Sequence, residues 1–307
     1  MVSSPSLGII VACHNEELYI GRCLKAIFSS LEGTKFNAKV LVILDCCIDK
    51  SAEIASQFPV ESFVKNGTTW ENSYAENLEI GFKKFIDYDY VSVIDADVLI
   101  PREFFTTMIT TLETESDLVS VASDLITERS TPFNRAYRIY EVFFKRMSLG
   151  GSLRGACRIY RGAAIHRLSQ GSEMTIIDDF IAPDSRLDQK IGGKRRSIPS
   201  VKSLHMRRIN FTKCIQGQKN AGRARKQLNL SFSKTVLHGI FRLRPFVIVG
   251  YLSHDNKKTK ENAPTIGRDK PLWASLPFQW QKGLNRCSRS IHTSYGAVFA
   301  RILKRYV

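Results

Sequence analysis

Short apolar runs alternate with helix-like segments through the first 125 residues of this 307-residue chain. The runs are rich in Val, Ile and Leu, and a strand is predicted wherever such a run is short and bounded by polar residues. Strands are predicted at residues 7–12, 38–44, 60–64, 90–94 and 117–123, with helices at 16–31, 49–58, 73–86 and 101–115. Regular strand–helix alternation predicts an α/β fold with a mostly parallel sheet covered by helices on both faces.

The pattern is looser beyond Ser130. An amphipathic helix is predicted for residues 132–149, then a glycine-rich turn, a strand and a helix within 150–168, a basic strand, and a helix over 210–230. Sequence after Ser231 has no sheet pattern. The expected organisation is a domain over residues 1–230, with halves 1–125 and 126–230, and a basic, aromatic C-terminal appendage over 231–307.

Charge is distributed very unevenly between the two halves. Residues 1–150 contain 14 Lys and Arg against 21 Asp and Glu, whereas residues 151–307 contain 31 against 8. A strongly basic half attracts polyanions, such as nucleic acid, anionic lipid headgroups or a phosphorylated substrate. A merely solubilising surface is the alternative.

Seven cysteines without CxxC spacing are typical of buried thiols in a reducing compartment. No charge-free apolar stretch approaches the roughly 18 residues that a membrane span needs. We therefore expect a cytoplasmic protein, with a peripheral position at the cytoplasmic face of a membrane as an alternative. The aromatic and basic stretches PLWASLPFQWQK and SYGAVFARILKRYV could lie at such an interface or pack back on the domain.

Polar clusters stand at the ends of three predicted strands. Ligands of parallel sheets bind outside the carboxyl ends of the strands, so these clusters are expected to form one site. Asp49 could instead cap the helix that follows it. The candidate residues at these strand ends are Asn15, Glu16, Asp45, Asp49, Asp95 and Asp97.

Asp95 and Asp97 flank Ala96 at the end of the apolar run VSVID. Side chains at i and i+2 of an extended chain point the same way, so the two carboxylates face one space and their repulsion needs compensation. Such a pair suits Mg²⁺ or Mn²⁺, because a hard cation often keeps one or two carboxylates and takes its other ligands from phosphate and water. Asp45, one strand away, could accept a hydrogen bond from a nucleobase N–H or from ribose hydroxyls.

Four segments in this order and spacing resemble the nucleotide-binding half of family-2 glycosyltransferases with the GT-A fold. They are IIVACHNEELYIGRCLKAI, LVILDCCIDKSAEIA, YAENLEIGFK and VSVIDADVLIP. The resemblance covers residues 5–125 well and 150–230 more loosely. It implies a Rossmann-like sheet, a nucleoside-diphosphate sugar donor, and an acceptor that is a saccharide or a lipid-linked group.

The resemblance also implies residue roles. Asp45 would contact the base and Asp49 would be structural or lie beside the ribose, while Asp95 would lie near ribose and diphosphate, with Asp97 the principal metal ligand. Asn15 and Glu16 match the polar residues that follow the first strand of the family. The family usually has a further acid just before the Asp45 position, where this chain has Leu44, so the nucleotide is left open.

The family places an acidic pair opposite the donor, and Asp178-Asp179 stands at the corresponding place. Asp179 is the candidate general base, with Asp178 beside it, and a single in-line displacement would make the enzyme inverting. The pair could instead favour the start of the next helix, and Asp184 is a substitute because the spacing to Gly192-Gly193 is long.

Arg223 and Arg225 fall where related enzymes hold the diphosphate. The processive Gln-X-X-Arg-Trp signature is absent, since the chain reads AGRARKQL, which favours transfer of one sugar. His166 and His205 are left outside the predicted site.

Two other functions remain open at this stage. A nucleotidyltransferase also needs an acidic metal site, but the loop after the first strand contains one glycine and no phosphate-binding pattern. A nucleic-acid-binding protein would use the basic half, but it would leave Asp45, Asp95 and Asp97 unexplained. Nucleic acid is therefore not an expected partner.

Overall fold

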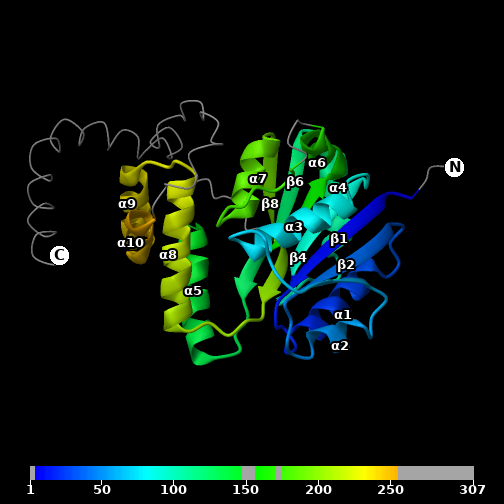
Figure 1. Ribbon diagram of the computed structural model, residues 1–307, viewed down its shortest axis with the longest axis horizontal. Helices are drawn as coiled ribbons and strands as arrows, with labels where there is room; N and C mark the ends of the chain where they lie inside the picture. Colours follow the sequence, from blue (N-terminus) through cyan, green and yellow to red (C-terminus); the bar gives the residue numbers. More distant parts are fainter. Residues whose placement is uncertain (1–3, 147–155, 171–174, 255–307) are drawn as a thin grey trace, which may run out of the picture. The chain divides into compact units, whose positions relative to one another are not determined.

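The centre of the fold is a β-sheet flanked by helices (Figure 1). Its strand order is β3-β2-β1-β4-β7-β6-β8-β5. The computed structural model describes residues 4–146, 156–170 and 175–254. Its strands are β1 (Ser6–Cys13), β2 (Asn37–Asp45), β3 (Glu61–Lys65), β4 (Tyr90–Asp95), β5 (Val98–Leu99), β6 (Leu118–Thr127), β7 (Cys157–Arg161) and β8 (Lys194–His205).

Four of the seven strand pairings within the described sheet are parallel. Strands β3, β2, β1 and β4 form one parallel block, and β6 pairs in parallel with β8. The antiparallel β7 joins the two groups by pairing with β4 on one side and β6 on the other. The short β5 also runs antiparallel to β8. The predicted α/β fold with a mostly parallel sheet is confirmed.

Helices connect the strands and then follow them at the end of the described chain. They are α1 (Ile20–Leu31), α2 (Ser51–Ala55), α3 (Ser73–Lys84), α4 (Phe104–Thr114), α5 (Pro132–Arg146), α6 (Gly162–Ser169), α7 (Pro183–Ile191), α8 (Phe211–Gln227), α9 (Phe232–Phe241) and α10 (Phe246–Ser253). Among the described residues, no helix is long and apolar enough to cross a membrane.

Alternate residues of the central strands enter two separate cores. From β1, Leu7, Ile9 and Val11 pack with the buried side chains of α1 and α4 on one face of the sheet. Ile10 points to the other face and packs with Leu78 and the rest of the apolar side of α3. The period of two in an extended chain therefore gives β1 an apolar surface on both sides, as a central parallel strand requires.

The last three described helices pack closely on one another. A Cβ atom on Gly222 of α8 would lie 2.0 Å from the carbonyl oxygen of Val247, and one on Gly250 of α10 would lie 2.0 Å from that of Lys219. The two helices thus meet backbone to backbone. Residues 231–254 pack within the same compact unit as the sheet. The stretches 271–282 and 294–307, considered for a membrane interface, lie outside the described residues.

Replacement of Gly222 by alanine tests this close approach, and Gly217 of the same helix supplies a matched control. Nothing lies within 4 Å of a Cβ atom on Gly217, whereas backbone atoms of α10 block one on Gly222. We expect Gly222→Ala to lower the free energy of unfolding by about 1–3 kcal/mol because the helices must move apart. Gly217→Ala should raise it by about 0.5–1 kcal/mol. Urea unfolding followed by circular dichroism measures both, and equal effects would contradict the packing.

Candidate active site

A pocket of about 650 Å³ lies at the carboxyl ends of β1, β2 and β4. Its position follows from the strand register, which sets Ala12 beside Asp95 and Cys13 beside Leu44. The pocket is lined by Ala12, Cys13, His14, Asn15, Glu16, Leu18, Tyr19, Asp45, Tyr74, Asn77, Asp95, Ala96, Asp97, His205, Arg207, Arg208 and Lys213. Five of the predicted residues, namely Asn15, Glu16, Asp45, Asp95 and Asp97, are therefore brought together.

Asp95 ends β4 inside this pocket. Its Oδ1 accepts a hydrogen bond of 3.0 Å from the hydroxyl of Tyr74, a residue in the first turn of α3. Burial, together with the negative charge of Asp97, raises the pKa of Asp95 to about 6, as expected for two acids in one space.

Asp97 is 2% exposed and lies between two cationic side chains. Its Oδ2 is 3.2 Å from Nε2 of His205 and 2.7 Å from Nε of Arg207. Burial alone would raise the pKa of Asp97, but the interactions with His205 and Arg207 outweigh burial and lower it. Neither contact has the alignment of a hydrogen bond, so Oδ2 remains a buried oxygen without a hydrogen-bond partner in the described residues.

This donor set fits a hard divalent cation. Carboxylate oxygens suit both Mn²⁺ and Mg²⁺, an imidazole nitrogen suits Mn²⁺ better than Mg²⁺, and Asp97 Oδ2 has no hydrogen-bond partner among the described residues. No group of three or more His, Cys, Asp or Glu side chains arranged for a metal occurs within the described ranges.

His205 was left out of the predicted site, and the structure places it in the pocket. The residue ends β8, where it pairs with Thr127 of β6 and with Val98 of β5. No local pattern around His205 indicates this position, because β8 reaches the site only through non-sequential strand pairing. The strand-end rule that selected the acids would have selected His205 only if β8 had been known to run parallel to β6 in the same sheet.

Arg207 contacts both Asp97 and Glu16, which lies in the loop after β1. Its guanidinium forms an ion pair with Oε1 of Glu16, which is 7% exposed. Burial raises the pKa of Glu16, and the charge of Arg207 partly offsets that rise. Asn15, in a left-handed conformation with φ of 53°, accepts a hydrogen bond of 2.9 Å from the N–H of Ile48 and so holds the loop after β2.

Asp45 lies at the end of β2, 6% exposed, among three donors. Ser73 Oγ donates at 2.5 Å, Asn77 Nδ2 donates at 2.9 Å, and Nζ of Lys65 is 3.2 Å away. Burial would raise the pKa of this carboxyl, but these donors lower it. Asp49 accepts the N–H groups of Ser51 and Glu17 and so holds the loop after β2 to the loop after β1, whereas the N-cap residue of α2 is Lys50.

The acids near α7 have different surroundings. Asp178 lies 2.7 Å from Arg186 Nε and 2.8 Å from Lys190 Nζ. Asp179 accepts hydrogen bonds from the backbone N–H groups of Glu71 and Asn72 at 2.7 and 2.8 Å. These bonds fix the residues that directly precede α3. Neither residue lines the pocket at the strand ends.

Asp184, in the first turn of α7, has no hydrogen-bond or ion-pair partner among the described residues. Its charge contributes to the raised pKa of Tyr74, whose main cause is burial, followed by Asp95. Like Asp178 and Asp179, Asp184 does not line the pocket, although Tyr74, whose pKa it affects, does.

Arg223 and Arg225 do not line the pocket either. Arg225 bonds to Thr235 Oγ1 at 3.2 Å and to the carbonyl of Lys234 at 3.3 Å, and thus links α8 to α9. The basic residues that do line the pocket are Arg207, Arg208 and Lys213, which lie between β8 and the first turn of α8.

A sequence profile described as Glycosyl transferase family 2 matches residues 8–169, more than half of the chain. The chain belongs to this family. It is also 27% identical over 123 residues to glycosyltransferase EpsH of Bacillus subtilis (strain 168). That similarity spans 38% of this chain and 33% of EpsH, so the match covers about a third of the length of this relative.

Solved structures of glycosyltransferases share the fold of this family member. The mannosyltransferase PcManGT from Pyrobaculum calidifontis, in complex with GDP-Man and Mn²⁺, is 16% identical, with a TM-score of 0.51 over 99% of this chain and 81% of its own. Residues 1–349 of S. aureus TarS, in complex with UDP-GlcNAc, are 14% identical, with a TM-score of 0.50 over 71% of this chain and 64% of TarS. These similarities confirm the GT-A fold.

Lys65 is the buried cation on which the Asp45 side of the pocket depends. Its Nζ contacts Asp45 at 3.2 Å and Glu76 at 3.0 Å, and the Lys65 side chain is 8% exposed. We expect Lys65→Met to lower the free energy of unfolding by about 3 kcal/mol, because buried carboxylate charge is left without its partner. Lys84→Met, at an exposed pair with Glu61, should cost less than about 1 kcal/mol. Urea unfolding at neutral pH compares the two, and similar losses would refute the role of Lys65.

Proposed function

We propose that this family-2 member transfers one sugar from a nucleoside-diphosphate sugar to an acceptor. The observation that carries the proposal is the position of Asp45, Asp95 and Asp97 in one pocket at the carboxyl edge of the sheet. The family assignment favours glycosyl transfer over the nucleotidyl transfer that the acids alone would also permit. The complexes of fold relatives with GDP-Man and UDP-GlcNAc are consistent with a nucleotide-sugar donor.

In the proposed binding mode, Asp97 and His205 hold Mg²⁺ or Mn²⁺, with Asp95 beside them. The metal would stabilise negative charge on the departing diphosphate. Arg207, Arg208 and Lys213 line the same pocket and supply further positive charge for the phosphates, the role that the sequence assigned to Arg223 and Arg225. Asp45 would accept a hydrogen bond from the nucleoside, in exchange for one of its present donors.

For the general base we place Asp184 ahead of Asp179 and Asp178. A base must direct an unpaired oxygen toward the acceptor hydroxyl. Both oxygens of Asp179 accept backbone N–H groups, and Asp178 is paired with two cations. The Asp184 carboxylate has no such partner among the described residues. A single displacement with this base would invert the anomeric centre.

Metal-dependent nucleotide binding provides the first test of the donor site. We expect UDP, GDP, CDP or dTDP to raise the melting temperature in the presence of Mn²⁺, since a ligand at 100 times its Kd stabilises by about 2.7 kcal/mol. Asp97→Asn and His205→Ala should lose the Mn²⁺-dependent part of this shift, because each removes a proposed metal ligand. Asp117→Asn changes an acid in an exposed pair with Lys194 and should keep the full shift. A full response in Asp97→Asn would refute the assignment.

The base assignment is tested by transfer and donor binding together. We expect Asp184→Asn to lower kcat by about 100- to 10,000-fold, because the acceptor proton loses its base, while the nucleotide shift persists. Asp179→Asn should change kcat less and lower stability instead, since one of two backbone bonds weakens. Transfer assays with the donor identified by the binding test measure both variants. Loss of activity in Asp179→Asn with unchanged stability would instead identify Asp179 as the general base.

A further inference from the structure

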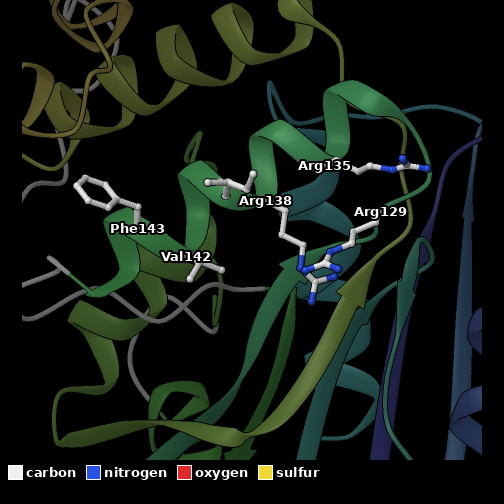
Figure 2. A pocket seen from close by; sticks show the side chains of 6 residues that line it. Arg129, Arg135, Arg138, Val142 and Phe143 are labelled. Carbon is white, nitrogen blue, oxygen red and sulfur yellow. The ribbon is translucent and has the colours of Figure 1, made fainter.

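Three cysteines lie within or beside the pocket at the strand ends, which we call the donor pocket. Cys13 ends β1 and lines this pocket, and Cys46 and Cys47 directly follow β2. A pocket along α5 is different, because its described lining contains no thiol and consists of Arg129, Arg135, Arg138, Ile139, Val142 and Phe143 (Figure 2). Of these two pockets, only the donor pocket can therefore undergo thiol chemistry.

The thiol of Cys47 lies against the end of β1. Its Sγ donates to the backbone carbonyl of Cys13 at 3.4 Å. Cys13 lies beside Leu44 in the register of β1 and β2, so the chain returns to Cys13 within three further residues. Cys46 makes this tight return in a left-handed conformation with φ of 49°, which strains a residue other than glycine. The turn at Cys46 thus brings the two sulfur atoms together.

The two thiols differ in their access to solvent. Cys13 is 1% exposed, whereas Cys47 is half-buried. Burial, together with the charge of Cys47 and a hydrogen bond between the two thiols, raises the pKa of Cys13 to about 12. An oxidant needs an accessible thiol that can ionise, so Cys13 resists direct attack and oxidation begins at Cys47.

We propose that Cys13 and Cys47 form a reversible modification site, in which hydrogen peroxide converts the two thiols into a disulfide. Peroxide first oxidises the Cys47 thiol to a sulfenic acid and releases one water. The Cys13 sulfur then attacks the Cys47 sulfur, the S–S bond forms, and the hydroxyl group leaves with the Cys13 proton as a second water. The two thiols thus lose two protons and two electrons, which peroxide takes up. A dithiol reverses the reaction by thiol–disulfide exchange.

The disulfide would join the loop after β2 to the end of β1 at the edge of the donor pocket. A covalent S–S bond is shorter than a hydrogen bond, so the loop must move toward Cys13. Asp45 lies two residues before Cys47 and accepts hydrogen bonds from Ser73 and Asn77 in its present position. We expect the disulfide to displace Asp45 from these donors and so to weaken nucleotide binding. This consequence rests on the proposed function, whereas formation of the disulfide does not.

The test is peptide mass spectrometry of the full chain after peroxide treatment, with free thiols alkylated before digestion by trypsin. Trypsin places Cys13 in residues 1–22, and Cys46 and Cys47 in residues 40–50. We expect a cross-link between these two peptides that dithiothreitol removes. Cys47→Ser should abolish the cross-link. Cys46→Ser, the matched control on the same peptide, should keep it.

Three results would overturn the proposal. One is the same cross-link in Cys47→Ser, since another thiol would then be the partner of Cys13. The second is a disulfide between the neighbours Cys46 and Cys47 in place of the cross-link. The third is oxidation of Cys47 to a sulfinic acid without any cross-link, because Cys13 would then be unable to reach the sulfenic acid.

Nucleotide binding in the presence of Mn²⁺ is measured on the same samples after removal of peroxide. We expect oxidation to weaken binding at least about tenfold and dithiothreitol to restore it. Cys47→Ser should bind the nucleotide equally before and after peroxide. A cross-link with unchanged nucleotide binding would refute the effect on the donor pocket. Absence of nucleotide binding before any oxidation would refute the proposed function, while the mass spectra would still decide the modification site.

Discussion

Compensation of the buried Asp97 charge is the constraint on which the site depends. A carboxylate that is 2% exposed needs cations close by, and this chain supplies them from His205 and Arg207, more than 100 residues away. Those residues can reach Asp97 only because β8 pairs with both β6 and β5. The charge balance of the pocket therefore depends on the strand order of the sheet. A different strand order would leave Asp97 buried and unpaired.

The part of the site that lies on β1, β2 and β4 could be predicted from sequence. Each of these strands is a local pattern of apolar residues, and parallel strands place their carboxyl ends at one edge. Asn15, Glu16, Asp45, Asp95 and Asp97 followed from that rule alone, and the structure brings all five to one pocket. The same periodicity accounts for the two cores on either side of β1.

The remaining residues depend on contacts that no local pattern encodes. Arg207 and His205 enter through non-sequential pairing, and Asp179 is bonded to backbone groups of a loop more than 100 residues earlier. Arg225 matched a family position, but its hydrogen bonds to Thr235 and Lys234 hold its side chain against α9. The helices α9 and α10 were missed because they contain few polar residues, so their sequences show no polar face opposite an apolar one. The position of α10 depends on close contact between the backbones of α8 and α10 at Gly222 and Gly250.

Several contacts between α5 and the rest of the protein depend on one atom, the amide nitrogen of Asn134. Its amide nitrogen donates to the carbonyls of Glu128 and Arg207 and to the hydroxyl of Ser130, while its oxygen accepts the N–H of Ile209. Aspartate at this position would replace that nitrogen by an oxygen and set a negative charge against three acceptors in a fully buried site. A change of this single atom would thus loosen the attachment of α5 to the segment that carries Arg207, without any change in the acids of the pocket.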